Sequence, residues 1–415
     1  GDPFYADFIT GEDAVLPDGK FPGGGPTGLA EFFGDHMVVN GMIWPKMNVE
    51  PRNYRLRFLN GCDSRFLAAQ FFEVPAGATD FSAAGQQLDF TVIGSDQGLA
   101  SSPTPGQTTL LMETGSRYDV IFDFKTVTPG SRVIMKNIGG DEPFGGDIPG
   151  PQVFGETDRV MAFDVVLPLD PAVPDVSPVG LGAYNAVPGV VSRTRKVALF
   201  EGKDEFGRLQ PLLGTAEPAT DFTENNPINW PATPEYQQAV FPDGTPSPLV
   251  GPMEGSIAWH SPTTENPALF ATEEWEIWNM TGDAHPVHLH LVHFEVLGRQ
   301  EINFDSQVDD DGFIPDGVTP VGNGAYLVPQ PTVQHNSVAG DNTTYGMGFR
   351  IVGTDLPASY GAVVPQPPEY VENAPKDMVT ALPGQITRIK AYFDKPGRYV
   401  WHCHILSHED HEMMR

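Results

Sequence analysis

Two short segments of this chain contain six of its eleven histidines. One segment reads His285-Pro-Val-His288-Leu-His290, and the other reads His402-Cys403-His404-Ile-Leu-Ser-His408. Side chains on a β-strand alternate between two faces. If the two segments are paired strands, Cys403 meets His285 on one face. The other face then gathers four imidazoles, those of His288, His290, His402 and His404.

The rest of the chain predicts many short strands joined by turns. Its 45 glycines and 41 prolines have no fixed period, and 40% of its 415 residues are hydrophobic. Alternation typical of strands occurs at residues 54–58, 118–124 and 275–278. Long periodic helical stretches and apolar runs of membrane-spanning length are absent from the sequence. We therefore expect an all-β protein built from tandem Greek-key β-sandwiches.

The two halves of the chain resemble each other, which indicates a duplicated domain. Residues 129–137 align without gaps to residues 396–404, and Phe122-Asp123 matches Phe393-Asp394. Leu59-Asn60 similarly matches Trp278-Asn279. We predict a first domain at residues 1–166 with no metal ligands and an incomplete N-terminal edge. A proline-rich linker at 167–194 and a metal-binding domain at 195–415 follow it.

Charge and cysteine content restrict the possible partners. The formal net charge of −30 argues against nucleic-acid binding, because phosphates would be repelled. The same charge suits solubility or a saline or extracellular habitat. Two cysteines do not define a redox compartment, and Cys62 is expected to be a buried free thiol. The sequence opens at Gly1 without a methionine or a signal peptide, so we interpret it as part of a longer polypeptide.

The spacing around Cys403 predicts a type 1, or blue, copper site. His408 lies five residues after Cys403, and Met413 lies ten residues after Cys403. His285 is the expected fourth ligand. A thiolate, two imidazoles and a weak axial thioether suit a metal that alternates between Cu(I) and Cu(II). Zinc is a less suitable metal, since structural zinc sites rarely use methionine. The alternative without a metal is a structural cysteine beside unrelated histidines.

The four imidazoles on the opposite face predict a second site that contains no sulfur. The backbone from Cys403 leads directly to His402 and His404. This connection is a short covalent path for single electrons. An outer electron acceptor would thus be coupled to an inner site that takes several electrons.

These two motifs resemble the C-terminal signatures of multicopper oxidases. Residues 34–41, Trp44-Pro45 and residues 49–57 are similar to the middle domain of spore-coat laccases and bilirubin oxidases. Residues 395–401 resemble bilirubin oxidases in particular. The resemblance covers most of 30–165 and 270–415 and is weakest in 200–260 and 300–370.

The resemblance implies roles for individual residues. His285, Cys403, His408 and Met413 would bind the type 1 copper. His288 would hold the type 2 copper, and His290, His402 and His404 would hold the type 3 pair. Glu409 matches an acidic residue that relays protons to bound oxygen, although it could equally be a solvated loop carboxylate.

The family's trinuclear cluster needs eight histidines, and four of them come from two further His-x-His pairs in an N-terminal domain, which this sequence does not contain besides His288-x-His290 and His402-x-His404. We therefore expect that a first cupredoxin domain is missing. It could be a separate chain after cleavage, or it could have been lost. The third alternative is a natural two-domain protein that no longer reduces oxygen. The remaining histidines stand alone and are predicted to be surface or core residues: His36, His260, His293, His335 and His411. His411 could also touch a substrate.

The resulting functional hypothesis is a laccase-like or bilirubin-oxidase-like enzyme outside the cytoplasm. It would take single electrons from phenols or tetrapyrroles and reduce O2 to water. One alternative is a metal oxidase acting on Cu(I), Fe(II) or Mn(II), although the twelve methionines form no methionine-rich segment. A copper nitrite reductase fits less well, because its histidines are divided differently. A non-catalytic electron-transfer or scaffold protein is the alternative from another class.

Overall fold

In the computed structural model, the chain is almost entirely β-structure. The structure describes residues 31–152, 156–177, 184, 186–204, 209–302, 325–335, 343–354 and 367–415. Residues 1–30 of the predicted first domain lie outside this part. The described helical segments are short: η2 (Phe124–Thr126), α2 (Pro234–Gln237) and α3 (Leu406–Asp410). The all-β prediction is therefore confirmed, and none of the described helices is long and apolar enough to cross a membrane.

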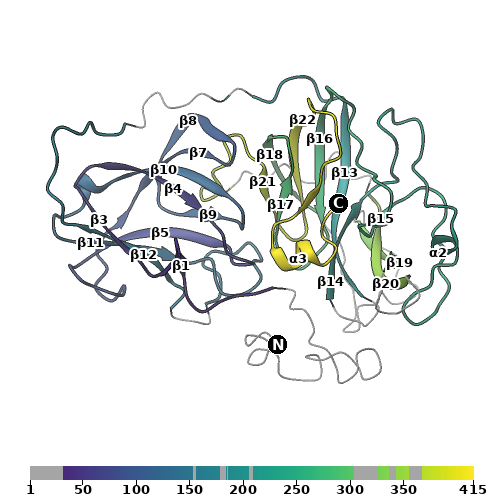
Figure 1. The fold of residues 1–415 in the computed structure, drawn as a ribbon, viewed down its shortest axis with the longest axis horizontal. Helices are drawn as coiled ribbons and strands as arrows, with labels where there is room; N and C mark the ends of the chain where they lie inside the picture. The colour runs from purple at the N-terminus through teal and green to yellow at the C-terminus, as the bar shows by residue number, and fades with distance from the viewer. Residues whose placement is uncertain are drawn as a thin grey trace.

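The first half contains two facing sheets and a small hairpin (Figure 1). One sheet has the order β4 (Asn53–Leu59), β10 (Arg117–Asp123), β7 (Phe90–Ser95) and β8 (Gly98–Gln107). The other has the order β3 (Lys46–Val49), β12 (Arg159–Val165), β11 (Arg132–Asn137), β5 (Leu67–Val74) and β6 (Gln87–Leu88), with β9 (Leu110–Met112) also paired to β5. The hairpin joins β1 (Val38–Val39) to β2 (Met42–Ile43). Buried aromatic side chains such as Phe71, Phe122 and Phe163 fill the space between the sheets.

The second half repeats this arrangement with additional strands. Its large sheet contains the path β15 (Gly255–Ser256), β14 (Leu209–Thr215), β13 (Arg193–Lys203), β16 (Thr272–Asn279), β22 (Gln385–Tyr392) and β18 (Phe294–Glu301). The pair β19 (Tyr326–Gln334) and β20 (Thr344–Val352) joins it through β13. A three-stranded sheet has the order β21 (Met378–Ala381), β17 (His285–Leu289) and β23 (Trp401–Cys403). This small sheet carries His285, His288 and His402.

Two buried asparagines make matching hydrogen bonds in the two halves. The Asn60 side-chain amide donates to the carbonyls of Arg65 and Met112, and that of Asn279 donates to the carbonyls of Asp283 and Ala381. Each side-chain oxygen accepts from the backbone N–H two residues later. The matched hydrogen bonds agree with the repeat in the sequence, and they make β4 the counterpart of β16.

A buried ionic network joins the two halves beside the histidines. Lys376 of the second half is fully buried, with its Nζ 3.0 Å from Asp96 Oδ2 of the first half and 3.6 Å from Glu113. Asp96 also accepts from the backbone N–H of Met378, at the start of β21. Buried charges need such partners to offset lost hydration. The first half therefore packs directly against the histidine-bearing sheet.

Three details differ from the expectations. The strand predicted at 118–124 ends at Asp123, because the Asp123 carboxylate caps the 3-10 turn that starts at Phe124. Cys62 is a free thiol but only half-buried, because it lies in a loop at the wall of a cavity rather than in the core. Strand β13 begins at Arg193, inside the stretch assigned to the linker, where Thr220 and Asp221 bind the arginine side chain.

Candidate metal centres

Paired strands bring the two histidine segments together. Strand β17 lies antiparallel to β23, with Val287 opposite Cys403 and His288 opposite His402. The α3 helix follows β23 and carries His408. Alternation along the two strands sends His285 and Cys403 to one side, and His288 and His402 to the other.

Three buried side chains converge on the first side. Cys403 Sγ lies 3.6 Å from His285 Nδ1 and 3.9 Å from His408 Nδ1, and the two nitrogens are 3.2 Å apart. All three donor atoms thus face a common point. A metal ion placed between these three atoms would be close enough to bind all of them.

Burial sets the protonation of these side chains. It lowers the pKa of His285 to about 4 and that of His408 to about 2, so both imidazoles are neutral at pH 7. It also raises the pKa of the Cys403 thiol well above its usual range. The thiolate form therefore requires a cation beside it, which a bound metal ion provides.

The two C-terminal methionines occupy different environments. Met413 is fully buried in the core of the second half, and its backbone bonds to Cys403 and to His408. Met414 is only partly buried and forms a backbone bridge with His402. Met413, and not Met414, belongs to the same buried cluster as Cys403.

Four imidazoles gather on the second side. His290 Nε2 lies 3.1 Å from His402 Nε2, and the donor nitrogens of His288, His290 and His402 lie within 4.8 Å of one another. The His404 ring is 5.7 Å from that of His402, and its buried Nδ1 has no hydrogen-bond partner among the described residues. Burial lowers the pKa of His288, His290 and His402, the last to about 4. Neutral imidazoles with free nitrogens are ready to bind a metal ion.

Hydrogen bonds from the backbone orient two of these rings. His288 Nδ1 bonds to the Asp377 carbonyl at 2.7 Å, and His402 Nδ1 bonds to the Cys403 carbonyl at 2.9 Å. In both rings the Nε2 atom is left for a ligand. Arg117 of the first half holds Asp377 through two hydrogen bonds of 2.8 and 2.7 Å to its carboxylate. The first half thereby helps to place His288.

Glu409, on α3, lies beside the four-histidine group. Its Oε2 is 3.2 Å from His402 Nδ1, and burial raises the pKa of its carboxyl group. This position is suitable for holding a proton near the four-histidine group. Its role as a proton relay stays a prediction.

A group of three carboxylates, which was not predicted from the sequence, lies beside the Cys403 site. Asp283 Oδ1 is 3.5 Å from His285 Nε2, and Glu31 Oε1 is 3.6 Å from His408 Nε2. Glu201 and Asp283 have oxygens within 4.8 Å of each other and of His285. Asp283 lies two residues before His285, in the loop that leads into β17, and this closeness in sequence was the one available signal. Nothing in the sequence indicated Glu31 or Glu201.

The remaining histidines stay outside both groups. His36 bonds to Asp35 at the surface, and the rings of His260 and His335 lie 5.1 Å apart. The ring of His293 contacts Tyr184, and His411 follows the α3 helix. None of them joins a metal-binding group among the described residues.

The donors present fit copper at both positions. A buried thiolate, two imidazole nitrogens and an adjacent buried thioether match a type 1 copper centre better than zinc, which seldom uses methionine. The second group offers imidazoles alone, which suit copper in either oxidation state.

Comparison with known proteins finds similarity to multicopper oxidases. A family model described as multicopper oxidase matches residues 226–323 and 346–415. A laccase of Bacillus subtilis (strain 168) is 30% identical over 394 residues, which cover 94% of this chain and 55% of the relative. A bilirubin oxidase of Albifimbria verrucaria is 28% identical over 389 residues, covering 93% of this chain and 48% of the relative. The chain spans about half the length of these relatives.

A solved structure supports the fold assignment. The multicopper oxidase McoA from the hyperthermophile Aquifex aeolicus aligns with a TM-score of 0.52 at 21% sequence identity. The alignment covers 94% of this chain and 60% of that structure. The expected fold, tandem cupredoxin-type β-sandwiches, is thereby confirmed.

Proposed function

Because the chain belongs to the multicopper oxidase family, we propose that it forms the electron-accepting part of a copper oxidase that uses O2. The observation that carries this proposal is the convergence of Cys403 Sγ with the Nδ1 atoms of His285 and His408. Copper, when bound, would supply one-electron transfer at this site and oxygen reduction at the four-histidine group. The reductant would be a phenolic or tetrapyrrole-type small molecule, and the protein would work outside the cytoplasm.

The residues of the chain would perform three tasks in this reaction. Burial of Cys403 and His285 excludes water, so the donor atoms keep one arrangement as the charge of the site changes. The peptide bonds from Cys403 to His402 and His404 connect the two sites directly. Glu409, 3.2 Å from His402 Nδ1, would hold a proton where oxygen reduction consumes protons.

The sequence supplies four of the eight histidines that the family's cluster uses. We propose that a further cupredoxin domain with two His-x-His pairs provides the others, on the same or a separate polypeptide. Isolated residues 1–415 should then bind about one copper tightly and be blue, because affinity rises with ligand count.

Metal analysis and an oxygen electrode test this proposal together. The isolated chain should accept an electron from a phenol without turnover. Addition of a chain carrying two His-x-His pairs should bring the copper count to about four, as one-plus-three copper sites require, and should start oxygen consumption. Sustained oxygen reduction by residues 1–415 alone would contradict the need for a further domain. A copper-loaded chain that is not blue would contradict the whole proposal.

A second candidate function, metal-ion oxidation, is favoured by the three carboxylates. The Glu31 side chain is 8% exposed, and both of its carboxylate oxygens are buried without a hydrogen-bond donor among the described residues. Burial and the nearby Asp283 raise the pKa of Glu31 and of Glu201. A divalent cation bound by these oxygens would offset the repulsion, and Fe(II) and Mn(II) accept carboxylate ligands.

Oxidation rates measured with Fe(II) and with a phenol would distinguish the two candidate functions. In the reconstituted enzyme, Glu201→Gln should reduce the Fe(II) oxidation rate at least tenfold while phenol oxidation changes little. Glu254→Gln, at a surface pair with Arg350, is the matched control. Equal losses with both reductants would count against a cation site.

A further inference from the structure

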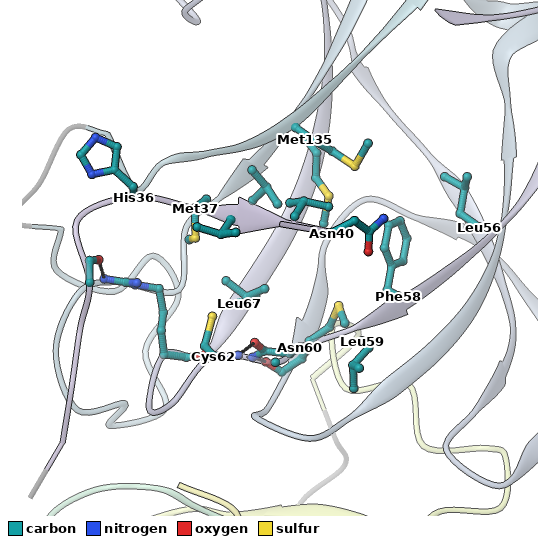
Figure 2. Close-up of a pocket in the computed structure, with 18 of the residues that line it drawn as sticks. His36, Met37, Asn40, Leu56, Phe58, Leu59, Asn60, Cys62, Leu67 and Met135 are labelled. Carbon is teal, nitrogen blue, oxygen red and sulfur yellow. Dashed lines mark hydrogen bonds between the residues drawn. The ribbon is translucent and has the colours of Figure 1, made fainter. Parts of the chain in front are cut away.

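A small cavity of about 230 Å³ lies on the sheet of the first half that contains β3, β12 and β11. Arg132 and Ile134 of β11 line it, whereas Val133 between them belongs to the core. Because strand side chains alternate, the cavity lies on the face of the sheet turned away from the core. It is distinct from the larger cavity that Cys62 lines, shown in Figure 2, although Met161 borders both.

Three cationic side chains line the small cavity, and no acidic side chain does so among the described residues. The three are Lys46, Arg132 and Arg159. Such a group is unusual in this chain, which has 24 Lys and Arg residues against 54 Asp and Glu residues. A hollow lined by charge of one sign concentrates ions of the opposite sign. The cavity therefore favours an anion, although the chain as a whole repels anions.

The ion pairs of these cations leave one positive charge unmatched. Asp164 binds both Lys46 Nζ, at 2.8 Å, and Arg132 Nε, at 2.6 Å. Asp158 Oδ1 lies 3.5 Å from Arg159 Nε. Three cations thus share two carboxylates, and a ligand with a single negative charge would balance them.

Trp44 forms part of the cavity wall and has two unusual properties. Its φ is +44°, in the left-handed region that residues other than glycine rarely adopt. Its Nε1 is buried and has no hydrogen-bond acceptor in the part of the chain that the structure describes. The Arg159 guanidinium lies 5.1 Å from the centre of the Trp44 ring. Backbone strain and unpaired buried polar groups of this kind are typical of ligand sites.

We propose that this cavity binds a small aromatic carboxylate. Its carboxylate group pairs with Arg159 and Lys46, since a planar guanidinium matches the two oxygens of a carboxylate. Its ring packs on Trp44 and against the apolar side chains of Ile134 and Met161. The volume lies below the roughly 300 Å³ at which sites for drug-sized ligands begin, so the ligand has a single ring. No lining residue belongs to either histidine group, and the proposal is therefore independent of the oxidase function.

NMR spectra of the indole N–H groups of the full chain test this site with benzoate as the probe. The chain has six tryptophans, and the Trp44 signal is identified by its loss in Trp44→Phe. Benzoate should shift the Trp44 signal to saturation and leave the other signals in place. Acetate, benzyl alcohol and inorganic phosphate should each bind at least about tenfold more weakly. Acetate and phosphate bury no ring, and benzyl alcohol makes no charge-assisted hydrogen bond.

Three variants test the role of charge inside the cavity. Arg159→Gln should weaken benzoate binding about tenfold, because a charge-assisted hydrogen bond is lost. Lys46→Gln changes a side chain that is 60% exposed, so the fold is retained, and it should weaken binding about threefold. Arg55→Gln is the matched control, because it removes the same charge outside the cavity, and it should bind benzoate as the unchanged chain does.

Four results would overturn the proposal. The first is a benzoate titration that leaves the Trp44 signal unchanged. The second is binding of acetate, benzyl alcohol or phosphate as tight as that of benzoate. The third is equal binding to Arg159→Gln and Arg55→Gln, and the fourth is unchanged binding to Lys46→Gln.

Discussion

Gly115 of the first half lies directly against the imidazole of His404 in the second half. A β-carbon at residue 115 would come within 2.7 Å of the His404 ring, and Gly115 has a φ of +82°. The neighbouring Thr114 hydroxyl donates a 2.8 Å hydrogen bond to the His404 carbonyl. The first half, which lacks the metal-binding residues of the repeat, thus shapes the four-histidine group.

Replacement of Gly115 by alanine should displace His404. We expect the reconstituted enzyme to lose copper from the four-histidine group while keeping its blue colour, measured by metal analysis and visible absorption. Gly130→Ala is the matched control, because Gly130 also has a positive φ but an added β-carbon would meet nothing within 4 Å. Each substitution costs about 1–2 kcal/mol for the left-handed backbone, so copper loss in both variants would contradict a role for the contact.

Cys403→Ser should abolish the blue colour of the copper-loaded chain. The strong visible absorption of such sites comes from a thiolate bonded to Cu(II), and serine offers no sulfur. Cys62→Ser should remain blue, since Cys62 lies outside the group formed by His285, Cys403 and His408. A blue Cys403→Ser protein would disprove the assignment.

Met413→Leu should raise the reduction potential of the blue copper site and retain the copper. Loss of a weak axial sulfur destabilises Cu(II) relative to Cu(I). Redox titration of the colour measures the shift. Met414→Leu should leave the potential unchanged, because Met414 lies outside the buried cluster around Cys403. The reverse result would place the axial ligand one residue later.

Arg117→Gln should weaken the placement of His288. The substitution removes both hydrogen bonds to Asp377, whose carbonyl accepts from His288 Nδ1. We expect a second His288 tautomer in nitrogen NMR spectra and a loss of about 1–2 kcal/mol in the free energy of unfolding, allowing for solvent screening of the half-buried guanidinium. Arg55→Gln, which breaks the pair with Asp119, is the control and should leave the His288 signals unchanged.

Acid should remove the stabilisation contributed by Asp164. The hydrogen bond from Arg132 lowers the pKa of this carboxyl from 3.8 to about 2 in the folded protein. A carboxyl group whose pKa is lower in the folded state than in the unfolded state stabilises the folded protein at every pH above the unfolded pKa. This stabilisation disappears as the pH falls from about 4 to about 2. Denaturant unfolding should show Asp164→Asn to be about 2 kcal/mol less stable at pH 7, with the difference vanishing near pH 2. A constant difference across this range would contradict the linkage.

The local pattern of the sequence was sufficient to predict which side chains gather in each of the two groups. Strand alternation has a period of two residues, so the spacing of His285, His288 and His290 assigns each ring to a face before any tertiary structure is known. The same reasoning separates Cys403 from its neighbours His402 and His404. The all-β architecture followed equally from strand alternation and turn residues.

Only the tertiary structure revealed contacts between segments that share no local pattern. Glu31 lies beside His408 and Glu201 beside His285, although each comes from a distant segment. Arg117 acts on His288 through Asp377. Among the described strands, none pairs with the outer side of β4, whereas β13 covers that of its counterpart β16. Such relationships depend on how sheets pack and on which edges remain unpaired, and sequence spacing carries no record of either.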